Sequence, residues 1–152
     1  MYNMKMRVPL ASSGLRDSDI ELVNKVLRSG NLTMGSEVKN FEKLMCEYLK
    51  VKHFIMMNSG SSANLLMFES LLRPTKSKPK LHPGDGILVP AIAWPTTIWP
   101  VIQLGLIPLF VDVDPKTLAL NLTEAQELID KARIPVAALF PIHPLGYAIP
   151  PS

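Results

Sequence analysis

NSGSSANLLMFESLL (residues 58–72) joins a small polar cluster to apolar residues at helical spacing. The apolar run before it, residues 53–57, predicts a strand, so the local order is strand, tight turn, helix. Such a turn leaves the first amide N–H groups of the helix unpaired, and Gly60 lets a ligand come close to the backbone. These amides and the positive end of the helix dipole favour a phosphate, to which Ser61 and Ser62 could add hydroxyl donors. The same serines could instead simply cap the helix, and the turn alone favours that role.

The rest of the chain alternates between strand and helix patterns. Strands are predicted at residues 87–90, 107–113 and 136–141, and the second of these should be buried on both faces because it is almost continuously apolar. Pro95 suits the first turn of the helix after the first of these strands. The alternation predicts an α/β fold in three layers, α/β/α, with a mainly parallel sheet and right-handed crossovers.

Capping signals predict where three helices begin. A capping box at residues 18–21 opens a helix that should stop at Gly30, and Ser36 opens a second helix. Another capping box, at residues 123–126, opens the last predicted helix, whose inward side chains should include Leu128, Ile129 and Ala132.

The composition is that of a chain with a globular core, with 47% hydrophobic and 19% charged residues. The net charge is +3. One loop carries four basic residues, Arg73, Lys76, Lys78 and Lys80. For this cluster, simple exposure to solvent is favoured over nucleic-acid binding. The single cysteine, Cys46, excludes an intramolecular disulfide, and no apolar run is long enough to span a bilayer. We see no signal peptide. A cytoplasmic protein with no nucleic-acid or membrane partner is expected.

Ligands of open α/β sheets bind at the carboxyl ends of the strands. There the sequence places the phosphate turn, the flat aromatic side chain of Trp94, two carboxylates and the imidazole of His143. This combination suits a flat, phosphorylated heteroaromatic ligand. At this point packing is as well supported for Trp94 as ligand binding. Asp112 and Asp114 are favoured as turn residues, and a histidine such as His143 more often packs or forms hydrogen bonds than catalyses.

Other chemistries lack their motifs. The chain contains no G-x-G-x-x-G opening a helix, no G-x-x-x-x-G-K-[ST] and no G-x-S-x-G, which removes the usual signatures of dinucleotide binding, P-loops and α/β-hydrolases. The histidines and the cysteine are scattered without the spacing of metal ligands, so no metal site is predicted.

Five segments in order resemble the DegT-type sugar aminotransferase family, the pyridoxal-phosphate enzymes of fold type I. They are SGNLTMGSEVKNFEKLMCEYL, FIMMNSGSSANLL, PGDGILVPAIAWPTT, GLIPLFVDVDPKTL and IHPLG. The resemblance implies the N-terminal part of the large domain of such an enzyme, with pyridoxal 5′-phosphate or pyridoxamine 5′-phosphate as cofactor and a homodimer in the full-length form. Residues 1–50 would be an N-terminal helical segment, and residues 51–152 a partial cofactor-binding α/β domain.

The resemblance also implies roles for cofactor-binding residues. Gly60, Ser61 and Ser62 match the turn that holds the cofactor phosphate, and Trp94 matches the aromatic side chain that stacks on the pyridine ring. These matches reverse the earlier preference for simple capping by the serines, and they favour ligand binding over packing for Trp94.

Substrate-binding residues follow from the same resemblance. Thr33 and Gly35 match a segment near the sugar-nucleotide site, and His143 matches the loop after the fourth strand. The GSSAN form of the turn, the AWPTT loop and the insert RPTKSKPKLHPGD resemble the nucleotide-sugar 3-dehydratase branch of the family. That branch acts on nucleotide-linked 4-keto-6-deoxy sugars and has histidine in place of the Schiff-base lysine.

No catalytic residue is assigned within this chain. In the family, the carboxylate that pairs with the pyridinium nitrogen and the Schiff-base lysine (or the histidine that replaces it) lie downstream of the matched region. The chain is therefore expected to be an N-terminal fragment that is inactive by itself. Two functions stay open: part of a dehydratase or aminotransferase in deoxysugar and lipopolysaccharide biosynthesis, or a non-catalytic remnant that binds a phosphorylated ligand or pairs with an intact homologue.

Overall fold

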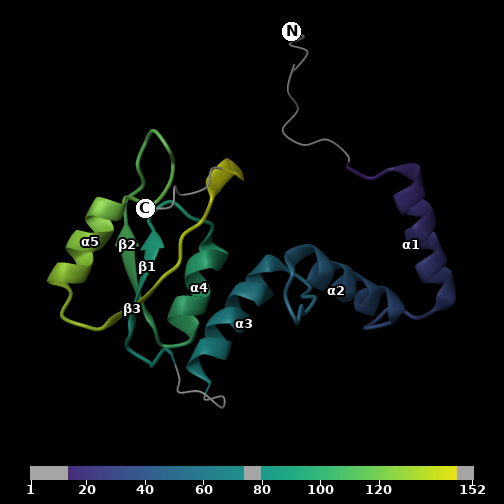
Figure 1. The fold of residues 1–152 in the computed structure, drawn as a ribbon, viewed down its shortest axis with the longest axis horizontal. Coiled ribbons are helices and arrows are strands. Elements are labelled where there is room, and N and C mark those ends of the chain that lie inside the picture. Colours follow the sequence, from purple (N-terminus) through teal and green to yellow (C-terminus); the bar gives the residue numbers. More distant parts are fainter. Residues whose placement is uncertain (1–13, 74–79, 147–152) are drawn as a thin grey trace, which may run out of the picture. The chain divides into compact units, whose positions relative to one another are not determined.

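The computed structural model describes residues 14–73 and 80–146 of the 152-residue chain (Figure 1). The chain divides into two compact units, Met1–Met56 and Met57–Ser152. Lys76 and Lys78 of the basic loop lie outside the described residues. Within those residues, no helix combines the length and the apolarity needed to cross a membrane.

Two amphipathic helices make up most of the described part of the first unit: α1 (Asp17–Ser29) and α2 (Ser36–Leu49). α2 begins at Ser36 as predicted, and α1 ends as predicted before Gly30, whose φ of 69° is a left-handed conformation that glycine adopts easily. The prediction for the start of α1 was wrong. Its N-cap is Arg16, and the Asp19 carboxylate closes the capping box by accepting hydrogen bonds from the Arg16 Nε and backbone N–H. Those two bonds, the side-chain one first, lower the pKa of Asp19.

The apolar faces of both helices are mostly uncovered within the unit. No residue of α1 or α2 is buried. Ile20, Val23 and Leu27, which form the apolar stripe of α1, are 48%, 55% and 55% exposed. Helices of this length draw most of their stability from packing, so the first unit has little stabilisation of its own.

The prediction of a strand at residues 53–57 was wrong, because residues 51–59 have no regular secondary structure. A strand is held by backbone hydrogen bonds to a neighbouring strand. Here the Met56 N–H donates instead to the Glu42 carboxylate of α2, at 3.0 Å. The Phe54 ring packs edge-on against Phe41, with 5.8 Å between centroids. Phe54 and the Met56 backbone therefore contact α2 instead of a neighbouring strand.

A three-stranded parallel sheet organises the second unit. Its elements in chain order are α3 (Gly60–Leu72), β1 (Gly86–Pro90), α4 (Pro95–Gln103), β2 (Ile107–Val111), α5 (Leu122–Lys131), β3 (Val136–Leu139) and a 3-10 turn (Pro144–Gly146). The strand order is β2-β1-β3, and Leu88 at the centre lies opposite Leu109 and Leu139. The predicted α/β class with a parallel sheet is confirmed.

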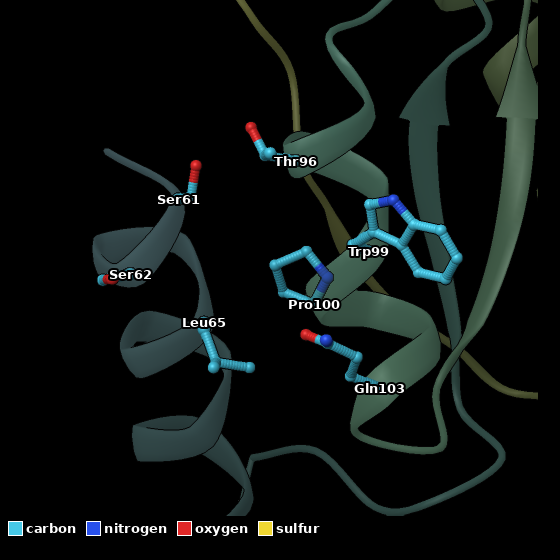
Figure 2. Close-up of a pocket in the computed structure, with 7 residues that line it drawn as sticks. All are labelled: Ser61, Ser62, Leu65, Thr96, Trp99, Pro100 and Gln103. Atoms are coloured by element: carbon cyan, nitrogen blue, oxygen red, sulfur yellow. The ribbon is translucent and has the colours of Figure 1, made fainter. Parts of the chain in front are cut away.

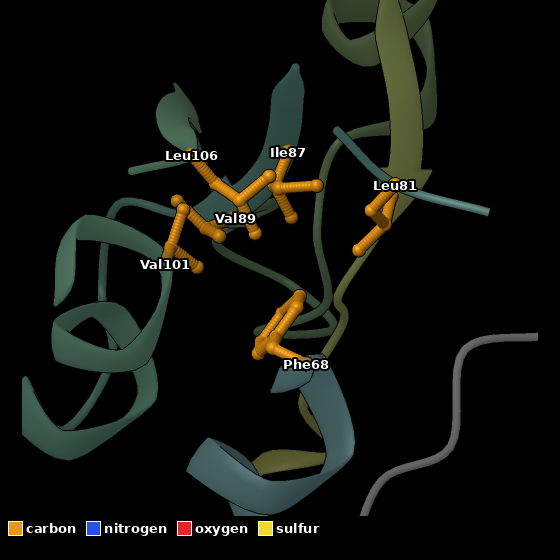
Figure 3. Packing of buried hydrophobic residues seen from close by; sticks show 6 residues of the cluster. All are labelled: Phe68, Leu81, Ile87, Val89, Val101 and Leu106. Carbon is orange, nitrogen blue, oxygen red and sulfur yellow. The ribbon is translucent and has the colours of Figure 1, made fainter. Parts of the chain in front are cut away.

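Helices cover both faces of this sheet (Figure 1). On one face, Ile87 and Val89 of β1 pack with side chains from α3 and α4 (Figure 3); the buried cluster is Phe68, Leu81, Ile87, Val89, Val101 and Leu106. On the other face, Leu88 packs with Ala125 of α5 and with Val111 and Leu120. Successive strand residues point to opposite faces, so β1 is buried on both, and the predicted three layers are confirmed.

The prediction that the strand at residues 107–113 is buried on both faces was wrong. β2 lies at an edge of the sheet, where Ile107 is 39% and Phe110 53% exposed. β1 is the strand buried along its whole length, because it has a partner on each side.

The predicted cap of the last helix was also wrong. Asn121 is the N-cap of α5, and its side-chain oxygen accepts the amides of Thr123 and Glu124 at 3.1 and 3.3 Å. The Glu124 carboxylate instead accepts the Asp112 N–H at 2.9 Å, which ties the start of α5 to the end of β2. Of the side chains predicted to point inward, Ile129 is 43% exposed.

Candidate functional site

The first turn of α3 forms a candidate phosphate seat, defined as residues 59–62. Ser59 is the N-cap, and its Oγ accepts the Ser62 N–H at 3.2 Å. Gly60 and Ser61 occupy the first two helical positions, whose amides have no acceptor within the helix. The Ser59 hydroxyl donates to the Ser62 Oγ at 3.2 Å, which leaves the Ser62 proton for another acceptor. The capping role considered for Ser61 and Ser62 is thus filled by Ser59.

The seat has free space and no negative charge of its own. Gly60 is exposed, and a Cβ added there would meet no atom within 4 Å. The first turn of α3 contains no acidic residue, so nothing in it opposes an anion at the positive end of the helix. Two amides, two hydroxyls and an open space fit the phosphate of the implied cofactor.

A cavity of about 410 Å³ lies between α3 and α4 and includes the two serines of the seat. Figure 2 shows the side chains that line it: Ser61, Ser62, Leu65, Thr96, Trp99, Pro100 and Gln103. The α4 members are spaced i, i+3, i+4 and i+7, so they share one helix face. The sequence prediction missed Leu65, Thr96, Trp99 and Gln103, although this helical spacing could have indicated the α4 face.

Trp94 is not among the residues that line this cavity. It is the N-cap residue of α4 and is 74% exposed, so the packing alternative for this side chain has no support in the structure. Trp99, which is 55% exposed, supplies the aromatic wall of the cavity instead. The stacking role of Trp94 stays a prediction.

The two carboxylates that follow β2 have the turn roles favoured by the sequence. The Asp112 Oδ1 accepts the Val113 N–H at 2.8 Å, and the Asp114 Oδ1 accepts the amides of Lys116 and Thr117 at 2.7 and 3.3 Å. Among residues 14–73 and 80–146, no group of three His, Cys, Asp or Glu side chains could hold a metal ion.

His143 follows β3 and is exposed. Its carbonyl accepts the Gly146 N–H at 3.2 Å, which closes the turn after the strand. Because the sheet is parallel, the carboxyl ends of β1, β2 and β3 lie on the same side of the second unit. The loop before Trp94, Asp112 and His143 follow these three strand ends in turn.

Thr33 and Gly35 lie in the first unit, where they help to line a cavity of about 640 Å³ formed by residues 22–38. A Cβ added at Gly35 would lie 3.0 Å from the Asn31 amide nitrogen, so the glycine leaves room for that side chain. Their contact with substrate stays a prediction.

Comparisons with known proteins agree with one another. The model of the DegT/DnrJ/EryC1/StrS aminotransferase family matches residues 14–150. The GDP-4-keto-6-deoxy-D-mannose 3-dehydratase of Yersinia pseudotuberculosis is 40% identical over 129 residues, which are 85% of this chain and 32% of that protein. The chain thus spans about a third of the length of this curated relative.

Solved structures of such dehydratases are also similar to this chain. A structure of GDP-4-keto-6-deoxymannose-3-dehydratase with bound GDP-perosamine has a TM-score of 0.72 at 43% identity, covering 78% of this chain and 30% of that one. The Escherichia coli GDP-4-keto-6-deoxy-D-mannose-3-dehydratase with bound hydrated PLP has a TM-score of 0.69 at 34% identity, covering 83% of this chain and 39% of that one.

Proposed function

The chain belongs to the DegT/DnrJ/EryC1/StrS aminotransferase family, and on this premise we propose that it is the phosphate-binding part of a pyridoxal-phosphate-dependent enzyme. The proposed substrate class is nucleotide-linked 4-keto-6-deoxy sugars, and the proposed reaction is 3-dehydration in deoxysugar and lipopolysaccharide biosynthesis. The names and 40% identity of the dehydratase relatives support this class. The observation that carries the proposal is the seat at the start of α3, where open space meets unpaired amides and hydroxyls.

Each residue of the seat has a stated task. The amides of Gly60 and Ser61 and the hydroxyls of Ser61 and Ser62 bind the phosphate, which the helix dipole also favours. The flat face of Trp94 orients the cofactor ring by stacking. When bound, the cofactor supplies an electron sink for carbanion chemistry.

The proposal extends to substrate, assembly and location. Thr33, Gly35 and His143 are proposed to contact the sugar nucleotide. A homodimer in the full-length form and a cytoplasmic location, where a nucleotide-linked substrate would be met, complete the proposal. Residues 1–50 and 51–152 are proposed as the helical segment and the partial cofactor-binding domain.

Cofactor retention tests the seat. In the protein that carries this chain, Ser61→Ala should weaken pyridoxal-phosphate binding by about 1–3 kcal/mol, the cost of losing a hydrogen bond to a charged group. Occupancy is read from absorbance after dialysis. Ser70→Ala is the matched control, because Ser70 lies on the same helix and its hydroxyl donates to the Met67 carbonyl. Unchanged occupancy in both Ser61→Ala and Ser62→Ala would remove the hydroxyls from the site and leave only the backbone amides.

The reaction class needs a separate measurement. A GDP-linked 4-keto-6-deoxy sugar incubated with the protein and a source of amino groups should lose its 3-hydroxyl, which mass spectrometry detects. Transfer of an amino group to the sugar would instead identify an aminotransferase of the same family. Cofactor binding without either change would support the non-catalytic alternative.

A further inference from the structure

One hydrogen bond joins the helix that carries the seat to the helix that begins after Trp94. The half-buried Asn64 side chain of α3 donates its Nδ2–H to the backbone carbonyl of Thr96, in the first turn of α4, at 3.4 Å. Asn64 lies two residues after Ser62, and Thr96 lies two residues after Trp94. The bond therefore spans the two places where the cofactor is proposed to be held.

The Thr96 carbonyl needs this outside donor because of Pro100. In an α-helix the carbonyl of residue i accepts the N–H of residue i+4. For Thr96 that residue is Pro100, which lies inside α4 and has no N–H to donate. Thr96 is half-buried, and a carbonyl shielded from water is costly to leave without a partner. The amide of Asn64 is a donor of the right kind at the right place.

We propose that Asn64 is a positioning residue, which sets the phosphate seat relative to Trp94 by donating to the carbonyl that Pro100 leaves without its helical partner. The inference rests on the proposed function for its effect on the cofactor. The link between the helices stands on the geometry alone. Asn64 itself does not touch the phosphate; it fixes the seat, which binds the phosphate, relative to Trp94, which stacks on the ring.

The test compares Asn64→Leu, close to asparagine in shape but without the donor, in two backgrounds. In the protein with Pro100 intact, Asn64→Leu should raise the dissociation constant for pyridoxal phosphate about fivefold, which corresponds to one ordinary hydrogen bond. It should also change the visible circular dichroism of the bound cofactor, which reports the orientation of the ring. In a Pro100→Ala background, residue 100 supplies its own N–H to Thr96, so Asn64→Leu should change the constant less than about twofold. Pro100→Val, closer to proline in volume, replaces this background if the alanine variant does not fold.

Gln126→Met is the matched control, because Gln126 donates a side-chain amide bond to Asp130 within α5, on the opposite face of the sheet. It should leave affinity and dichroism unchanged. Equal losses of affinity from Asn64→Leu in both backgrounds would assign the effect to packing and overturn the proposal. So would unchanged affinity and dichroism in Asn64→Leu.

The contribution of the hydrogen bond between Asn64 and Thr96 to stability can also be measured without any ligand. Asn64→Leu should raise the equilibrium constant for unfolding about fivefold with Pro100 intact and much less in the Pro100→Ala background. Equal increases would overturn the link. If the unchanged protein binds no pyridoxal phosphate, the proposed function fails and the positioning role fails with it, while the unfolding measurements still decide whether the link exists.

Discussion

The serine that caps α3 is Ser59, not Ser61 or Ser62, the two serines considered for that role from the sequence. Ser59 caps the helix through its bond to the Ser62 amide, while Ser61 is exposed beside Gly60. Each of the three serines in NSGSS would be a suitable N-cap. The one that caps the helix is set by the residue at which the helix begins, which the sequence does not fix to within one or two residues. The sequence therefore located the seat but could not say which hydroxyls are left for a ligand.

Trp94 and Trp99 show how far residue-level prediction reached. The α/β pattern placed Trp94 at the carboxyl ends of the strands, and the family resemblance gave it the stacking role; neither carries information on its neighbours. The structure places Trp99 in one cavity with Ser61 and Ser62. Its helical spacing with Thr96 and Gln103 was visible in the sequence, but which face of α4 meets α3 depends on how the two helices pack.

Trp94→Ala should lower pyridoxal-phosphate occupancy, whereas Trp94→Phe should have a small effect because a flat face remains. Because Trp94 is 74% exposed, both changes should alter the free energy of unfolding by less than about 0.5 kcal/mol. Absorbance after dialysis and chemical denaturation measure the two quantities. Trp99→Ala is the comparison, since Trp99 shares the cavity with the seat. Loss of occupancy in Trp99→Ala but not in Trp94→Ala would transfer the stacking role to Trp99.

At the level of elements, three of the four predicted strands are present in the structure. The strand predicted at residues 87–90 is β1, which begins one residue earlier, at Gly86. What failed was the assignment of neighbours. An apolar run favours a strand, but it cannot show that Phe54 packs against a helix or that β2 lies at an edge of the sheet. The order β2-β1-β3 is set by tertiary packing.

Gly86→Ala should destabilise the second unit by about 1–3 kcal/mol, the usual cost of overpacking. A Cβ at Gly86 would lie 2.8 Å from the Leu109 Cδ1 and 3.3 Å from the Pro135 carbonyl oxygen. The leucine can move, but the carbonyl is held because it accepts the Gly86 N–H at 2.7 Å. Chemical denaturation measures the loss. Gly14→Ala is the matched control, since a Cβ there meets nothing within 4 Å. Equal stability of the two variants would show that the start of β1 has more room than the structure gives it.

On the scale of the whole chain, the two units differ in how they are stabilised. The second unit has a core on each face of its sheet, with Ile87, Val89 and Val111 fully buried. The first unit has amphipathic helices without one buried residue. The sequence predicted both helices because amphipathic spacing is a local signal, although it misplaced the start of α1. Spacing does not show whether an apolar face is covered.

Hydrogen exchange on residues 1–152 should therefore divide the chain at the boundary between the units. Amides of β1 should exchange slowest, because the strand is paired on both sides and buried throughout. Amides of α1 and α2 should exchange fastest among the helices, since short helices with little tertiary packing open readily. α5 is the internal control: it is also amphipathic, but its Ala125 is buried against the sheet. Protection of α1 and α2 that rises with protein concentration would support the proposed homodimer as the cover for these faces. Protection equal to that of β1 in dilute protein would show that the first unit is stable by itself, and the contrast between the units would be wrong.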